Sequence, residues 1–239
     1  MTGIRSVQFE WGPTGAAAVV GAGSVAVVVD VLSFTTTLTV AVDAAMTVYP
    51  FSWKDERAEA YAAERDAVLA RGRSLREGVS LSPVSVRAAV GVERLVLPSP
   101  NGSSISFALA ESGASVVGAS LRNASAVARH LVSAGSVAVI AAGERWPDGS
   151  LRPAVEDLWG AGAVIAALVD QGRDDLSPEA RVAEQAFRAV APRLADQLRG
   201  CVSGRELIDG GFGEDVEVAL ELDGSQVVPV LRGAAFVAG

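Results

Sequence analysis

The chain has 239 residues, of which 50% are hydrophobic but only 5% aromatic, so its core must be built from Ala, Val and Leu. The net charge of −8, without any cluster of Lys and Arg, argues against binding to nucleic acid or to an anionic membrane surface. A single Cys and a single His exclude an internal disulfide and a zinc cluster. The first residues lack a signal peptide, and the uncharged stretch 12–29 is broken by Gly21 and Gly23, so we expect a cytoplasmic protein without a membrane helix.

Strands and helices alternate along the predicted chain. Apolar runs predict strands at 4–10 (an edge strand), 25–31 (buried on both faces), 46–51, 94–97, 115–118 and 137–141. Amphipathic patterns and capping residues predict helices near 36–44, 54–71, 103–111, 123–133, 153–171 and from Pro178 onward. Residues 72–87 and 143–149 are expected to be loops, and 215–222 with 227–231 a hairpin around Asp223-Gly224. The order indicates an α/β fold: a layered sheet with flanking helices and a C-terminal hairpin.

Two segments share one layout. Aligning residues 30–51 with 98–119 brings Thr35 and Thr36 onto Ser103 and Ser104, which predicts two similar βαβ-like units. Chance similarity between two ordinary units is the alternative. No linker divides the chain, so we expect a single compact domain over 1–239, with two lobes at roughly 1–120 and 121–239 as a variant.

Familiar motifs of phosphate and nucleotide chemistry are absent. No Gly-Lys pair supports a P-loop, and Leu207 stands where a cysteine phosphatase built on Cys201 needs an Arg. The strand end Asp30-Val31-Leu32 lacks the second carboxylate of a haloacid dehalogenase. The pattern that begins at Gly21 resembles a dinucleotide fingerprint, but it opens a strand instead of following one.

Three polar groups follow strands or open helices. They are Asp30 with Ser33 and residues 35–37, then residues 101–104, then residues 143–145 with Glu156 and Asp157. Ligands of α/β sheets bind at the carboxyl ends of strands, where hydroxyls and free N–H groups suit a phosphate or sulfonate. Carboxylates suit a hard cation. Ordinary helix capping is the alternative explanation for each group.

The chain resembles the 2-phosphosulfolactate phosphatase family of coenzyme M biosynthesis. The resemblance rests on VVVDVLSFTTT, Ser82-Pro83, PNGSS, LRNASAVA, AAGERW, VEDLWGAGAVI and GFGEDVEVALELDGSQVVPVL, in that order. It implies an α/β fold, hydrolysis of a phosphate monoester of a small acidic hydroxy acid, and a requirement for Mg²⁺. The positions that match the family are Asp30, Asn101, Gly102, Asn123, Glu156, Asp157 and Asp215. Ser33 departs from the family, because the resemblance predicts an arginine there.

These observations together predict a site. Asp30 and Glu156 are the expected catalytic residues, and Mg²⁺ is expected on Asp30, Glu156 and Asp157. The expected substrate-binding residues are Thr35, Thr36, Thr37, Asn101, Gly102, Ser103, Arg122, Asn123 and Arg145. The partner is then a small anionic phosphate ester, and a homodimer is one expectation for the assembly. Two alternatives stay open: a catalytically silent anion-binding relative, and an NAD-linked oxidoreductase that uses Gly21 and Gly23.

Overall fold

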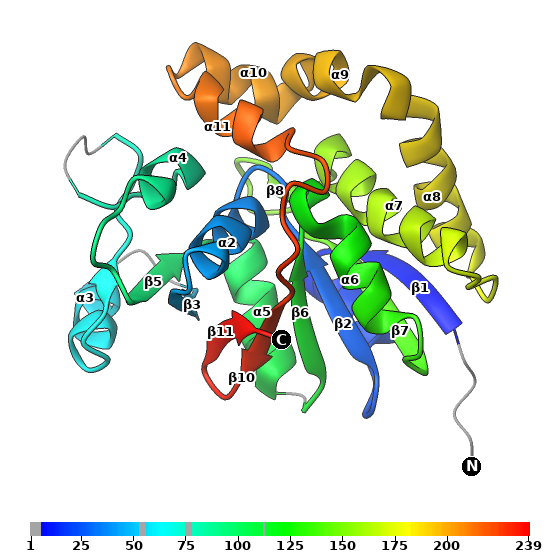
Figure 1. Cartoon of the computed structure of the whole chain (residues 1–239), viewed down its shortest axis with the longest axis horizontal. Helices are drawn as coiled ribbons and strands as arrows, with labels where there is room; N and C mark the ends of the chain where they lie inside the picture. The colour runs from blue at the N-terminus through cyan, green and yellow to red at the C-terminus, as the bar shows by residue number, and fades with distance from the viewer. Residues whose placement is uncertain (1–5, 53–55, 75–77, 112) are drawn as a thin grey trace.

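The protein has an α/β architecture in which helices flank one large sheet (Figure 1). The computed structural model describes residues 6–52, 56–74, 78–111 and 113–239. Nine strands form the large sheet and two more form a small antiparallel sheet. In these described ranges, no helix has the length and apolar character needed to span a membrane. The predicted fold class is confirmed.

The large sheet consists of two parallel blocks joined by a hairpin. Its strands, in spatial order, are β1 (Ser6–Trp11), β7 (Ser136–Ala141), β2 (Val25–Val29), β6 (Ser115–Ala119), β10 (Pro229–Arg232), β11 (Ala235–Ala238), β3 (Thr47–Phe51), β5 (Arg94–Pro98) and β4 (Val68–Leu69). The first four are mutually parallel, and so are the last three. The β10–β11 hairpin pairs antiparallel with β6 on one side and with β3 on the other. The two parallel blocks therefore run in opposite directions.

Both faces of the sheet are buried, as the apolar run of β2 predicted. Val27 and Val29 pack into a core with α6 (Ala124–Leu131), α7 (Val155–Asp170) and α8 (Pro178–Val190). Ala26 and Val28 pack on the other face with α1 (Gly12–Val19), α2 (Phe34–Asp43) and α5 (Gly102–Glu111). Because successive side chains of a strand point to opposite faces, β2 contributes to both cores.

Shorter helices and turns complete the fold. They are α3 (Glu56–Ala63), α4 (Pro83–Arg87), α9 (Leu194–Gly200), α10 (Val202–Asp209), α11 (Gly213–Ala219) and the 3-10 turns Leu121–Asn123 and Ala191–Arg193. Figure 1 shows α8, α9 and α10 as an arc that ends above α11, while α3 and α4 lie at the far side of the molecule.

The predicted repeat is present in an interlocked form. The two units are β2–α2–β3 and β5–α5–β6. The first strand of each unit lies beside the second strand of the other, because β2 pairs with β6 and β3 pairs with β5. The amino ends of α2 and α5 therefore come from equivalent places in the two units. The division of the chain into one domain or two lobes stays a prediction.

Several predicted elements are wrong. Helix α1 lies where no helix was expected, and Pro13 occupies its first turn, where a proline fits. The helix predicted at 54–71 is shorter than expected. It begins at Glu56 in the described part of the chain, which leaves out residues 53–55, and it ends at Ala63. The strand β4 follows it. Two expected loops hold short elements: α4, and the hairpin of β8 (Glu144–Arg145) with β9 (Leu151–Arg152).

The C-terminal hairpin exists but lies later in the chain than predicted. Residues 213–219 form α11, and the hairpin is made by β10 and β11. Asp215, Val216, Val218 and Ala219 are the buried residues of α11, a spacing of one helix face. Over so short a segment the alternation of polar and apolar residues also fits a strand, which explains the error.

Candidate active site

Asp30 lies where the two repeated units meet. It directly follows β2, its carboxylate is buried, and its two oxygens accept hydrogen bonds from two helix starts. Oδ1 accepts the N–H of Phe34 at 3.1 Å, in the first turn of α2, and Oδ2 accepts the N–H of Gly102 at 3.0 Å, the first residue of α5. Free N–H groups at helix starts favour a negative charge. The structure therefore brings Asp30 and the Asn101-Gly102 turn together.

A cavity of about 170 Å³ opens beside Asp30. Its lining comes from four parts of the chain: the strand end at residues 30–34, the segment with Arg73 and Leu81, the strand end at residues 97–101, and Glu144 of β8. The cavity thus sits at the carboxyl ends of β2 and β5, the part of an α/β sheet where ligands usually bind.

Glu144 is a second carboxylate of this cavity. Its Oε2 accepts a hydrogen bond of 2.9 Å from Asn101 Nδ2, which ties β8 to the α5 turn. Burial, followed by the negative charge of Asp30, raises the pKa of Glu144 to about 7. Glu144 also lines a wider cleft of about 780 Å³ between the β8–β9 hairpin and α10, to which Glu156 contributes. Glu144 therefore lines both the Asp30 cavity and the wider cleft.

Asp157 holds the strand ends together from the first turn of α7. Its oxygens accept the N–H groups of Val31 at 2.7 Å and of Gly143 at 2.9 Å, so the turns after β2 and β7 are tied to one side chain. Both oxygens are already engaged with the backbone. Unlike Asp30, Asp157 lines neither the Asp30 cavity nor the wider cleft, so we assign it the task of positioning the loop of Asp30.

The acidic groups form one electrostatic cluster. Burial raises the pKa of Asp30, the charge of Glu156 adds to the rise, and the N–H bonds of Phe34 and Gly102 oppose it. Burial together with the charges of Asp30 and Glu156 raises the pKa of Asp157 well above its ordinary value. Such a cluster is stable only if protons or a cation offset the repulsion.

The predicted threonines are structural. The side chains of Thr35, Thr36 and Thr37 are fully buried, and their hydroxyls donate to the backbone oxygens of Asp30 (2.7 Å), Val31 (2.7 Å) and Leu81 (3.1 Å). Ser103 behaves likewise, since its hydroxyl donates to Leu97 O at 2.8 Å. None of the four lines the Asp30 cavity. These hydroxyls therefore do not form the expected phosphate cradle. They do not cap α2 either, since its N-cap residue is Ser33, which makes no side-chain cap hydrogen bond.

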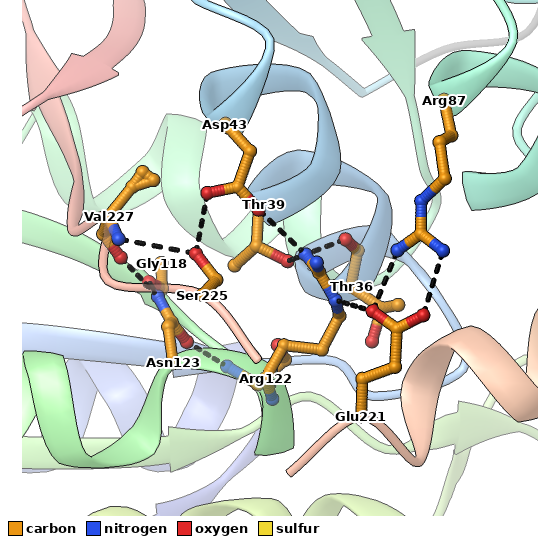
Figure 2. Close-up of polar contacts among 11 residues, drawn as sticks. Thr36, Thr39, Asp43, Arg87, Gly118, Arg122, Asn123, Glu221, Ser225 and Val227 are labelled. Atoms are coloured by element: carbon orange, nitrogen blue, oxygen red, sulfur yellow. Dashed lines mark hydrogen bonds and ion pairs between the residues drawn. The ribbon is translucent and has the colours of Figure 1, made fainter. Parts of the chain in front are cut away.

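Arg122 and Asn123 lie in a separate polar network (Figure 2). The Arg122 guanidinium, with a side chain only 5% exposed, donates to Thr39 at 2.9 Å, Asp43 at 3.1 Å and Glu221 at 3.1 Å. The side chain of Asn123 accepts the N–H of Ser120 at 2.9 Å and donates to the backbone oxygens of Gly118 and Val227. Neither residue lines the Asp30 cavity, so the structure separates both from the remaining candidates.

Arg145 lies near the site but outside its cavity. It belongs to β8, is exposed, and donates to Gly149 O at 3.0 Å and to Pro100 O at 3.4 Å. It lines the wider cleft together with Glu144 and Glu156. The structure thus places Arg145 at the rim.

Arg73 is the cavity residue that sequence reasoning missed. It donates from Nε to Asp215 Oδ2 at 2.8 Å and from Nη2 to the hydroxyl of Ser33. A positive charge therefore stands against Ser33, where the family resemblance predicts an arginine. No local signal pointed to Arg73, because it lies in a segment taken for a loop. Glu144 was better signalled, since it belongs to a polar group that follows a strand.

The glycines of the dinucleotide-like pattern are not placed to bind a dinucleotide. Gly21 and Gly23 form the turn between α1 and β2, ahead of the strand. A dinucleotide-binding turn must follow a strand and open a helix.

The single cysteine of the chain is not reactive. Burial first, and then the nearby Glu156, raises the pKa of the Cys201 thiol to about 12. His130 is exposed on α6.

Comparisons with known proteins agree on one family. The family model of 2-phosphosulpholactate phosphatase matches residues 17–234. A protein of Deinococcus radiodurans named probable 2-phosphosulfolactate phosphatase is 31% identical over 217 residues, covering 87% of each chain. Proteins with the same name from Carboxydothermus hydrogenoformans (32% identical, 85% of this chain and 84% of that one) and Thermotoga petrophila (30% identical, 89% and 91%) are similar as well. The chain therefore belongs to the 2-phosphosulfolactate phosphatase family, a family of phosphoric monoester hydrolases, as its motifs predicted.

Proposed function

We propose that this protein is a Mg²⁺-dependent phosphatase that hydrolyses the phosphate monoester of a small acidic hydroxy acid, with 2-phosphosulfolactate as the model substrate. The observation that carries the proposal is the position of Asp30. Its carboxylate lies between the amino ends of α2 and α5 and opens onto a cavity that it shares with Glu144. The family membership supports the same reaction class.

The residues of the site fit a divalent cation by their chemistry. Asp30 and Glu144 line one cavity, Glu156 interacts with both through its charge, and carboxylate oxygens are the ligands that Mg²⁺ prefers. An anionic ester next to these carboxylates is repelled unless positive charge lies between them. Among the described residues, no three acidic, His or Cys side chains are already arranged around a metal position. We propose that the anionic ester itself contributes to binding the metal.

We assign the candidate carboxylates different tasks. Asp30, Glu144 and Glu156 would hold the cation, which supplies positive charge to the phosphoryl oxygens. Asp157 keeps its two backbone bonds and acts as a positioning residue for Asp30. Asn101 orients Glu144 through its 2.9 Å hydrogen bond. The N–H groups at the starts of α2 and α5 add a favourable field for the anionic substrate.

In the proposed reaction, water adds to phosphorus while the bond between phosphorus and the ester oxygen breaks. The products are inorganic phosphate and the free hydroxy acid, and the proton of the water ends on the leaving oxygen or in solvent. Asp30 would orient the attacking water, since its carboxylate is the one that the backbone fixes from two sides. Stabilising charge on the transferred phosphoryl group is the main catalytic contribution expected for this chemistry.

Phosphate release from 2-phosphosulfolactate, with Mg²⁺ and with EDTA, tests the proposal. We expect activity with Mg²⁺ only, and a loss of about 100-fold or more in Asp30→Asn and in Glu156→Gln, because each removes a carboxylate from the cluster. Glu144→Gln should lower activity as well. Asp170→Asn is the control, since this exposed acid lies on the same helix as Glu156, about 20 Å further along.

Near-normal turnover in both Asp30→Asn and Glu156→Gln would remove this site from the proposal. Activity that is unaffected by EDTA would remove the metal while leaving the phosphatase. Binding of the ester without any phosphate release would favour the silent anion-binding alternative.

A further inference from the structure

Arg73 is the positive side chain of the Asp30 cavity. Among the described residues that line this cavity, it alone carries a cationic group. Its Nε donates to Asp215, and its Nη2 donates to the Ser33 hydroxyl and to Leu81 O at 3.4 Å. In the described part of the chain, Nη1 has no hydrogen-bond partner, and the side chain is 20% exposed. One edge of the guanidinium therefore remains available to a ligand.

The rest of the guanidinium is held firmly. Asp215, on α11, is only 2% exposed and accepts Arg73 Nε at 2.8 Å. Its second oxygen accepts the hydroxyl of Ser82, the cap of α4. Two helices thus fix the carboxylate, and the carboxylate fixes the planar arginine. A guanidinium that is oriented in this way loses little conformational freedom when it binds an anion.

The cavity is lined by both acidic and basic groups. The acidic groups are Asp30 and Glu144, and the basic group is Arg73, which donates to the Ser33 hydroxyl. A phosphorylated hydroxy acid carries two kinds of anion, the phosphate and the acid group that is not transferred. Under the proposed function the phosphate lies beside the carboxylates and their cation. The remaining acid group then needs a separate positive partner, and a planar arginine fits a carboxylate or sulfonate well.

We propose that Arg73 binds the acid group of the substrate that is not transferred, and so selects phosphate esters that carry a second negative charge. This inference rests on the proposed phosphatase function. Asp215 is its positioning residue, because it holds the guanidinium and lies behind it instead of lining the cavity. The chemical class of the ligand is a short acid with a carboxylate or sulfonate next to the ester carbon.

Two substrates separate this role from others. 2-Phosphosulfolactate carries acid groups, whereas isopropyl phosphate has the same secondary ester and none. We expect Arg73→Met to raise KM for 2-phosphosulfolactate at least 10-fold, with kcat changed much less, because a charge-assisted hydrogen bond is lost. Turnover of isopropyl phosphate should fall less than threefold. Arg73→Lys should restore part of the affinity.

A folding defect is controlled by a paired variant. Removing Arg73 leaves the buried Asp215 carboxylate without its guanidinium, which destabilises a protein. The double variant Arg73→Met with Asp215→Asn removes that charge as well, and it should show the same substrate pattern as Arg73→Met. Equal losses for both substrates would overturn the proposal, since Arg73 would then act on the phosphoryl group or on the fold alone.

Direct binding keeps the test independent of turnover. Calorimetry with sulfolactate, which carries no phosphate, should detect binding to the wild-type protein and at least 10-fold weaker binding to Arg73→Met. Equal affinity for both proteins, or no binding to either, would also overturn the proposal. A wild-type protein that binds sulfolactate but hydrolyses neither ester would instead refute the phosphatase function and leave the anion site of Arg73 supported.

Discussion

Gly102 shows how one missing side chain shapes the site. A Cβ atom at this position would lie 2.3 Å from Cδ1 of Phe34 and 2.9 Å from Oδ2 of Asp30. Phe34 is itself buried and packs edge to face with Phe236, so its ring has little room to move. Only glycine allows α5 to begin so close to Asp30 that its N–H reaches the carboxylate.

Gly102→Ala should therefore disturb the site and the core at once. We expect at least a 10-fold loss of phosphatase activity, because the Asp30 carboxylate is displaced, and a lower melting temperature. Gly135→Ala is the matched control, since a Cβ there meets nothing within 4 Å. Activity and thermal unfolding of both variants check this, and an active, stable Gly102→Ala would show that α5 can shift without harm to Asp30.

The residues of the site differ in how far local sequence could identify them. Asp30, the Asn101-Gly102 turn and Glu156-Asp157 could be found because they follow strands or open helices, the places where ligands of α/β folds usually bind. Thr35 and Thr36 carry the same local signal, yet their hydroxyls bond the backbone. A hydroxyl at a helix start suits a cap and a ligand equally, so only the surrounding structure distinguishes the two uses.

At the scale of elements, α7 depends on close packing. A Cβ at Gly162 would lie 2.2 Å from the carbonyl oxygen of Ala183 in α8, and one at Gly160 would lie 2.5 Å from Val31. Two glycines thus let α7 approach α8 on one side and the β2 strand end on the other. This brings Glu156 and Asp157, in the first turn of α7, to the site.

Gly162→Ala is expected to destabilise the protein by about 1–3 kcal/mol, because the backbone of α8 must move. For a chain of this length, that lowers the melting temperature by roughly 2–4 °C per kcal/mol. Gly200→Ala in α9 is the control, since nothing lies within 4 Å of its Cβ, and it should be neutral or slightly stabilising. Differential scanning calorimetry of both variants measures their melting temperatures. Equal melting temperatures would mean that α7 and α8 can move apart without loss of stability.

At the scale of the molecule, one ionic network joins distant parts of the chain (Figure 2). Glu221 accepts two hydrogen bonds of 2.7 Å from Arg87 of α4 and one of 3.1 Å from Arg122. Arg122 in turn reaches Asp43 at the end of α2, which also accepts the hydroxyl of Ser225 at 2.7 Å. The first and second halves of the sequence are linked through these contacts.

This network predicts how stability depends on pH. The hydrogen bonds from Arg87, together with Arg122, lower the pKa of Glu221 in the folded state. A lowered pKa stabilises the fold fully above the ordinary Glu pKa of about 4.3, and this stabilisation disappears as the pH falls through the folded value. Glu221→Gln should thus lose roughly 1 kcal/mol or less at pH 7, since a side chain that is 35% exposed is partly screened by solvent.

Urea unfolding at pH 7 and pH 3 measures this difference. The gap between wild type and Glu221→Gln should shrink at the lower pH. Glu59→Gln, which removes an exposed acid 3.6 Å from Arg71, is the control and should differ little from wild type at either pH. A gap that stays constant with pH would show that the contribution of Glu221 is not ionic.

The sequence by itself determined the α/β class, the family, the strand-end acids, the helices α2, α5, α6, α7 and α8, and the strands β1, β2, β3, β5, β6 and β7. These features follow from periodicity, capping and short motifs, which act between residues close in the chain. Tertiary structure alone decided that β10 and β11 join two opposed parallel blocks, that Arg122 serves the network of Glu221, and that Arg73 reaches Ser33. Such pairings depend on contacts between residues 40 or more positions apart, for which a single sequence carries no local pattern.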